Sequence, residues 1–112
     1  MNVLSGHQPH YLPSVQYFAK IAASKVFVFS DDVKYVRGDW QNRNRILRGH
    51  SPSAGWQYLT VPVAGGDDGK LIREKEIAGT GWVDKHLAAL EQAYKRRPGW
   101  ALLGPVLDQI DM

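Results

Sequence analysis

The apolar residues near the start of the chain follow two different patterns. Residues 3–4 and 26–29 are short runs of aliphatic and aromatic side chains, each followed by polar or glycine positions, and such runs predict strands. Between them, apolar side chains recur at intervals of three and four after Pro13, which predicts a helix over residues 14–23. We expect the two strands to be parallel and joined by a right-handed crossover, with the second strand buried on both faces.

The second half of the chain predicts one further strand, a short edge strand and two helices. Residues 56–63 suit a half-buried strand, and residues 72–78 are expected to return as an edge strand after a glycine-rich turn. A helix is predicted between Thr80, a suitable N-cap, and Pro98, which cannot continue it. A last helix over residues 100–110 contains a Gly-Pro pair that would break it or delay its start. The predicted helix between Thr80 and Pro98 has an apolar face that consists of Val83, Leu87, Leu90 and Tyr94.

These elements predict an α/β fold, in which a small sheet with a parallel βαβ unit at the start is followed by C-terminal helices. A chain of 112 residues fits one domain around one hydrophobic core. The hydrophobic fraction of 44% is enough for such a core to form. We therefore expect residues 1–112 to make a single domain.

Charge and cysteine content exclude several classes of function. The net charge of +3 comes from 14 basic and 11 acidic side chains, a balance that disfavours non-specific nucleic-acid binding. The basic excess lies between Lys34 and Arg48, with Asp39 as the one acid there, so a small anionic substrate is expected to bind in this stretch. The absence of cysteine excludes disulfides, thiol nucleophiles and thiolate zinc sites.

The apolar runs also bear on the expected location of the protein. No run approaches the roughly 20 residues that span a bilayer. The first residues carry neither the basic region nor the apolar stretch of a signal peptide. We therefore expect a cytoplasmic protein without a membrane span.

Two polar motifs follow the first two predicted strands directly. One covers residues 7–13 and the other residues 30–32. Because parallel strands end at the same edge of a sheet, imidazoles and carboxylates from the two motifs are expected to meet there, which suits acid–base chemistry or the orientation of an imidazole. The alternative is that the histidines cap strand or helix ends and the two aspartates form a turn. The candidate catalytic residues are His7, His10, Asp31 and Asp32.

The spacing His7-x-x-His10 is also similar to the His-x-Gly-His signature of nucleotidylyltransferases, in which imidazoles stabilise phosphates. Pro9 replaces the glycine of that signature, and Pro13 delays the helix that follows. His50 and His86 have no convergent partners in the sequence and are assigned no role.

A third motif, residues 40–46, concentrates amide and guanidinium donors. Arginine can grip phosphate or carboxylate with two parallel hydrogen bonds, and neighbouring amides can hold hydroxyl groups of a sugar or nucleotide. The alternative is an exposed strand or turn whose arginines pair with nearby aspartates. The candidate substrate-binding residues are Gln8, Tyr11, Trp40, Gln41, Asn42, Arg43, Asn44 and Arg45.

The order of these motifs resembles the WbqC-like protein family. The matching segments are His7-Gln8-Pro9, Tyr11-Leu12-Pro13, Tyr17-Phe18, Lys20-Ile21, Val26-Phe27-Val28-Phe29, Asp31-Asp32-Val33, Trp40-Gln41-Asn42-Arg43-Asn44-Arg45-Ile46, Leu59-Thr60-Val61-Pro62-Val63, His86 and Glu91-Gln92-Ala93-Tyr94. The resemblance implies a transferase of bacterial polysaccharide, O-antigen or related natural-product biosynthesis, transferring an aminoacyl group such as glycine or a nucleotidyl group. The alternative function is a non-catalytic module that binds a nucleotide sugar or a partner protein.

The roles expected of the site residues follow from their chemistry. His7 would polarise the substrate or exchange a proton with it, and Arg43 and Arg45 would clamp an anion. Asp31 or Asp32 would orient His7 or hold a divalent metal, so the candidate cofactors are Mg²⁺ and a nucleotide.

The chain departs from the family pattern in three ways. His10 stands where asparagine is expected, Ser14-Val15-Gln16 replaces Trp-Leu-Gly, and typical members continue for about as long again. The chain is therefore expected to be a truncated or short version of the family, with a second copy or a partner protein supplying the missing C-terminal half.

Overall fold

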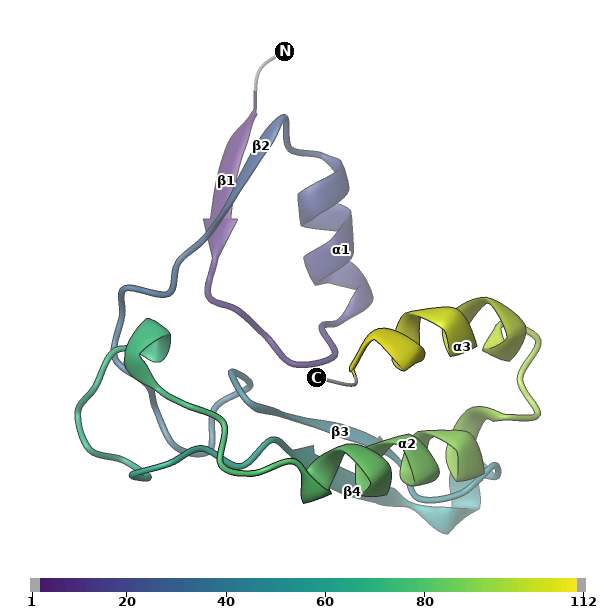
Figure 1. Cartoon of the computed structure of the whole chain (residues 1–112). Coiled ribbons are helices and arrows are strands. Elements are labelled where there is room, and N and C mark those ends of the chain that lie inside the picture. The colour runs from purple at the N-terminus through teal and green to yellow at the C-terminus, as the bar shows by residue number, and fades with distance from the viewer. Residues whose placement is uncertain (1–2, 111–112) are drawn as a thin grey trace. The chain divides into compact units, whose positions relative to one another are not determined.

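The computed structural model describes residues 3–110 and has a mixed α/β fold (Figure 1). Two compact units divide the chain. Unit 1 consists of Met1–Asn44 and Val63–Glu76, and unit 2 consists of Arg45–Pro62 and Ile77–Met112. The predicted fold class, with a parallel strand pair near the start and helices at the C-terminal end, is confirmed.

Unit 1 begins with a βαβ unit. Strands β1 (Leu4–His7) and β2 (Val26–Phe29) pair in parallel, with Leu4 opposite Val26 and His7 opposite Phe29. Helix α1 (Val15–Ala22) connects them, within the predicted range (Figure 1). Ser14 is its N-cap, because its extended backbone lets Oγ accept a hydrogen bond from the amide of Tyr17 at 3.4 Å.

The prediction that β2 is buried on both faces is wrong. The ring of Phe27 packs against Tyr17 of α1, with centroids 5.7 Å apart. Val26 and Val28 point to the opposite face and are 52% and 49% exposed. Successive side chains of a strand alternate between the two faces, so one crossover helix can cover only one of them.

Residues 72–74 form the 3-10 helix η2 (Ile72–Glu74) rather than the start of the predicted edge strand. The Glu74 carboxylate accepts a hydrogen bond from the amide of Leu71 at 2.9 Å, and the Glu74 amide donates back to the Leu71 carbonyl at 2.9 Å. These reciprocal bonds close a turn where the apolar pattern suggested extended backbone. Extended pairing begins only afterwards, where the Ala64 amide donates to the Glu76 carbonyl at 2.9 Å.

A buried lysine holds the glycine-rich turn of unit 1. The Lys75 side chain is 4% exposed, and its Nζ lies 3.1 Å from the Asp68 carboxylate. The same ammonium donates to the carbonyls of Ala64 at 2.6 Å and Gly66 at 2.7 Å, and lies 5.3 Å from the centroid of the Tyr35 ring. An ammonium has three donors, so these three oxygens satisfy it completely.

Unit 2 contains a two-stranded antiparallel sheet of β3 (Arg43–Leu47) and β4 (Trp56–Thr60). The 3-10 helix η1 (Pro52–Ala54) lies in the connection between the two strands. Arg43 and Asn44, the first residues of β3, belong to unit 1. The strand predicted over residues 56–63 is confirmed for the residues of β4, and residues 43–46 of the third polar motif form part of β3.

Helix α2 (Gly81–Tyr94) confirms the predicted central helix of unit 2. Its most buried side chains are His86, Leu90 and Ala93. Thr80 does not cap it as predicted, because its backbone lies at φ −124° and ψ −9° and its side chain makes no capping hydrogen bond. The Thr80 carbonyl instead accepts from the amide of Val83 at 3.1 Å.

The chain ends in helix α3 (Trp100–Leu107) and the 3-10 helix η3 (Asp108–Ile110). The Gly-Pro pair neither breaks α3 nor delays its start, contrary to the prediction, and Pro105 lies inside the helix. An interior proline removes one backbone donor and crowds the carbonyl four residues before it, a local cost that α3 tolerates without ending. No helix within residues 3–110 is both long and apolar enough to cross a membrane.

Candidate functional site

A pocket with a volume of about 510 Å³ opens at the carboxyl ends of β1 and β2 in unit 1. The two strands end together, since the His7 carbonyl accepts a hydrogen bond from the Ser30 amide at 2.8 Å. Loops that follow parallel strands therefore meet at this edge. The pocket is lined by His7, Gln8, His10, Ser30, Val33, Asp39 and Trp40.

The two histidines form one aromatic cluster with Tyr17 of α1. The rings of His7 and His10 meet edge to face, with centroids 4.6 Å apart and an interplanar angle of 82°. The Tyr17 ring lies 5.1 Å from each of them. Its hydroxyl donates to the Gln8 carbonyl at 2.7 Å, and His7 Nδ1 lies 3.2 Å from the same oxygen. Tyr17 is 6% exposed, so a core side chain fixes both imidazoles.

His10 has the electrostatic properties of a base. Burial lowers the pKa of its imidazole, the nearby His7 lowers it further, and Asp39 acts in the opposite direction. These effects together favour the neutral form of the ring. Neither of its nitrogens bonds to any residue in the 3–110 range, which leaves them open to a ligand.

A relay of amides runs from the loop after β2 to the pocket. The Val36 amide donates to Gln41 Oε1 at 3.0 Å, and Gln41 Nε2 donates to Gln8 Oε1 at 3.0 Å. Gln41 is buried, with 9% of its surface exposed, whereas Gln8 lines the pocket. Gln41 thus fixes the Gln8 side chain from behind.

The loop that carries His10 is held by Asn44. Asn44 Nδ2 donates to the carbonyls of Tyr11 at 3.2 Å and Leu12 at 2.6 Å. Leu12 has φ 49°, a left-handed backbone conformation that is costly for residues other than glycine or asparagine. The Tyr11 amide also donates to the Trp40 carbonyl at 3.3 Å. Burial raises the pKa of Tyr11 to about 12, so its phenol stays protonated. Asn44 and Tyr11 therefore support the loop.

Trp40 is held by contacts with Asp39, which precedes it in the chain, and with Arg43, which follows it. Its amide donates to the Asp39 carboxylate at 2.8 Å. The guanidinium of Arg43 donates to the Gly38 carbonyl at 2.5 Å, and its central carbon lies 5.7 Å from the centroid of the Trp40 ring. The indole is 38% exposed. It is thus a fixed aromatic surface at the pocket.

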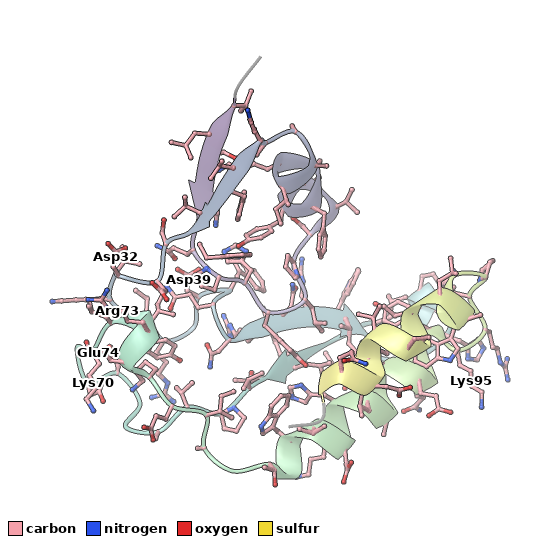
Figure 2. The ribbon with its side chains drawn as sticks, turned by 45° about the horizontal axis from the view of Figure 1, so that its top comes forward. Asp32, Asp39, Lys70, Arg73, Glu74 and Lys95 are labelled. Carbon is pink, nitrogen blue, oxygen red and sulfur yellow. The ribbon has the colours of Figure 1, made fainter. Side chains whose placement is uncertain are left out.

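Several predicted site residues lie outside the pocket. Asp31 and Asp32 are exposed on the loop after β2, where the Asp31 carbonyl accepts from the Arg73 amide at 3.0 Å. Figure 2 shows Asp32 beside Arg73 where this loop meets η2. Arg45 belongs to unit 2, where its guanidinium lies over the Trp56 ring at 5.3 Å. Asn42 accepts a hydrogen bond from the Tyr35 hydroxyl at 3.2 Å.

Asp39 is the carboxylate that the pocket contains, and the sequence patterns did not identify it as a site residue. It lies between β2 and β3, far along the chain from the histidine motif, and no local spacing links the two. The link is tertiary, since Tyr11 and Trp40 share a backbone hydrogen bond. No group of three or more His, Asp or Glu side chains within the described range could hold a metal ion.

Comparison with known proteins connects this chain to one family. The model of the WbqC-like protein family matches residues 8–111. The uncharacterized protein Rv1507c of Mycobacterium tuberculosis is 43% identical over 88 residues, which cover 78% of this chain and 36% of that protein. The chain thus spans little more than a third of this relative's length. No solved structure gives a significant match. With nearly its whole length matched by the family model, the chain belongs to the WbqC-like protein family.

Proposed function

We propose that the pocket around His10 is the acceptor site of a transferase. In this proposal, a sugar ring lies on Trp40, and one of its hydroxyl or amino groups gives a proton to His10. The observation that carries the proposal is that two imidazoles, a carboxylate and an indole line one pocket of unit 1. The group transferred is aminoacyl, such as glycine, or nucleotidyl, in bacterial polysaccharide, O-antigen or related natural-product biosynthesis. That reaction class is what the likeness to the WbqC-like family implies.

His10 is the general base of the proposed reaction. A base must be unprotonated at working pH and within reach of the proton that it removes. Burial lowers the pKa of His10, and its ring nitrogens bond to no other residue in the described part of the chain. After proton transfer, the Asp39 carboxylate stabilises the imidazolium, in keeping with its opposing effect on the same pKa. His7 packs edge-on against His10 and orients its ring.

The proposed step conserves atoms and charge. The acceptor oxygen or nitrogen loses its proton to His10 and forms a bond to the acyl carbon or phosphorus of an activated donor. The bond from that centre to the leaving group breaks with its electron pair. The imidazolium then returns the proton to the leaving group, so His10 is neutral again at the end of the cycle.

Trp40 is the proposed platform for the sugar. Aromatic side chains bury the apolar face of a ring while its polar groups stay at the edge. The indole is partly exposed and fixed by Asp39 and Arg43, so little conformational freedom is lost on binding. No Lys or Arg is among the described residues that line the pocket. The acceptor is therefore proposed to be neutral there, and an anionic donor would meet Arg43 beside Trp40.

The test uses His10→Gln with His50→Gln as its control, because His50 is an exposed histidine in unit 2. Methyl glycosides of neutral and amino sugars are screened by saturation-transfer NMR, then incubated with activated glycyl or nucleotidyl donors and analysed by mass spectrometry. Loss of a general base should lower kcat by about 10²–10⁴-fold in His10→Gln. Glycoside affinity should change little, and His50→Gln should match the wild type.

Two results would contradict the proposal. Unchanged turnover in His10→Gln would remove the base from the mechanism. Glycoside binding that persists in His10→Gln, with no product from either protein and any donor, would make the pocket a non-catalytic binding module.

A further inference from the structure

The direction of the amide relay is fixed by its first member. The Val36 backbone N–H can only donate, so the Gln41 atom 3.0 Å away must be its carbonyl oxygen. Gln41 therefore turns its NH₂ group toward Gln8. The Gln8 atom that it meets at 3.0 Å must in turn be an oxygen. A backbone donor thus determines the orientation of both side-chain amides, which distance alone would leave ambiguous.

The consequence lies in the pocket. With its oxygen engaged by Gln41, Gln8 has its NH₂ group left, and this group bonds to no residue in the 3–110 range. Gln8 cannot rotate its amide to offer an oxygen without placing two NH₂ groups against each other. The Gln8 backbone is also fixed, because its carbonyl accepts the Tyr17 hydroxyl.

We infer that Gln8 is a specificity-determining residue that donates to an acceptor-only oxygen of the ligand, and that this oxygen belongs to an uncharged carbonyl group. Asp39 lines the same pocket, and Lys and Arg do not appear among its described lining residues, which disfavours a phosphate or carboxylate at this position. A hydroxyl group both donates and accepts, so it would not need a donor of fixed direction. This inference rests on the proposed function. The acceptor sugar then carries an acylamino group, such as acetamido, whose carbonyl oxygen accepts from Gln8.

The test reverses the direction of the hydrogen bond between Gln41 and Gln8 by a substitution at Gln41, which does not line the pocket. In Gln41→Glu, one carboxylate oxygen still accepts from Val36, but the other now requires a donor from Gln8. Gln8 would therefore turn its NH₂ group to Glu and present its oxygen to the ligand. Gln57→Glu is the matched control, because the amide of Gln57 bonds to the Leu47 carbonyl in unit 2.

The probes are the methyl glycoside of N-acetylglucosamine and methyl glucoside, which share a ring and differ in the acetamido group. Wild type and Gln57→Glu should bind the acetamido glycoside at least about tenfold more tightly, as expected for one hydrogen bond to a fixed donor. In folded Gln41→Glu the preference should fall to within about twofold, with methyl glucoside affinity almost unchanged. A preference retained in folded Gln41→Glu would overturn the inference.

A second measurement needs no variant. In ¹⁵N-labelled wild type, the side-chain amide protons of Gln8 should shift on addition of the acetamido glycoside, while those of Gln41 stay in place. Gln8 protons that do not move would overturn the inference even if Gln41→Glu fails to fold.

The outcome for Gln8 is separable from that for His10. Loss of the acetamido preference in Gln41→Glu, together with full turnover in His10→Gln, would keep the inference and reject the catalytic base. An unchanged preference in Gln41→Glu, together with loss of turnover in His10→Gln, would do the opposite. If neither glycoside binds the wild type, both are rejected.

Discussion

His86 Nε2 lies 3.1 Å from the carbonyl oxygen of Thr60, so that a histidine buried in α2 ties this helix to the end of β4. The imidazole is 5% exposed and lies 5.0 Å from the Trp82 ring. A carbonyl oxygen accepts, so Nε2 carries the proton of the neutral tautomer. Burial lowers the pKa of His86, and the bond to Thr60 opposes this effect only in part.

This relationship predicts that the protein loses stability in mild acid. The folded-state pKa lies below the unfolded value of 6.5, so the unfolded chain binds more protons between these two values. The free energy of unfolding should therefore fall as the pH drops through 6.5. Urea titrations at pH 7.5 and 5 measure this loss. His10, whose pKa is also lowered, should contribute in the same direction.

His86→Gln separates the two contributions. Glutamine can still donate to Thr60 but does not titrate in this range, so the pH dependence should be smaller than in the wild type. The same pH dependence in His86→Gln and wild type would show that His86 is not the group responsible.

A second prediction concerns the core of unit 2. Leu90 is 4% exposed, whereas Leu102 of α3 is 82% exposed. Leu90→Ala should lower the free energy of unfolding by about 2–5 kcal/mol, the usual cost of removing a buried leucine side chain. Leu102→Ala should change it by no more than about 0.5 kcal/mol. Chemical denaturation of both variants checks the difference, and equal effects would mean that this face of α2 does not form the core.

A third prediction concerns the turn held by Lys75. Lys75→Met keeps the length and the apolar stem but removes the charge-assisted hydrogen bonds to Asp68, Ala64 and Gly66. Unfolding should become easier by about 2 kcal/mol, because these oxygens lose their donor. Lys70→Met, at an exposed position of the same turn, is the control. Thermal melts that rank the two variants equally would contradict a structural role for Lys75.

The sequence predicted those elements whose signals are local. Helix α1 and the two parallel strands follow from hydrophobic periodicity and from Pro13. Helix α1 and β2 form where expected, whereas β1 continues to His7, beyond the predicted residues 3–4. The 3-10 helix η2 was not predicted, because the Glu74 side chain closes a turn where the pattern of apolar residues alone predicts extended backbone. Burial of β2 was overestimated because strand composition does not reveal how many layers cover the sheet.

The candidate site was predictable to a similar extent. The motif around His7 and Gln8 lies at the pocket, because the end of a parallel strand is a property of topology that the sequence does encode. Asp39 was not found, since its approach to His10 depends on a loop folding back over many residues. His86 was assigned no role for the same reason, since its partner Thr60 is distant in the sequence. Lys75 was not identified because its contacts depend on how the glycine-rich turn folds, which residue spacing alone does not reveal.

The most direct measurement of the central claim, that His10 is a neutral base beside His7 and Asp39, is an NMR titration of its imidazole. The pKa should lie below the ordinary value of 6.5. Asp39→Asn should lower it further, because the carboxylate stabilises the imidazolium, and His7→Gln should raise it, because His7 lowers the pKa of His10. A His10 pKa at or above 6.5 that neither substitution moves would contradict the account.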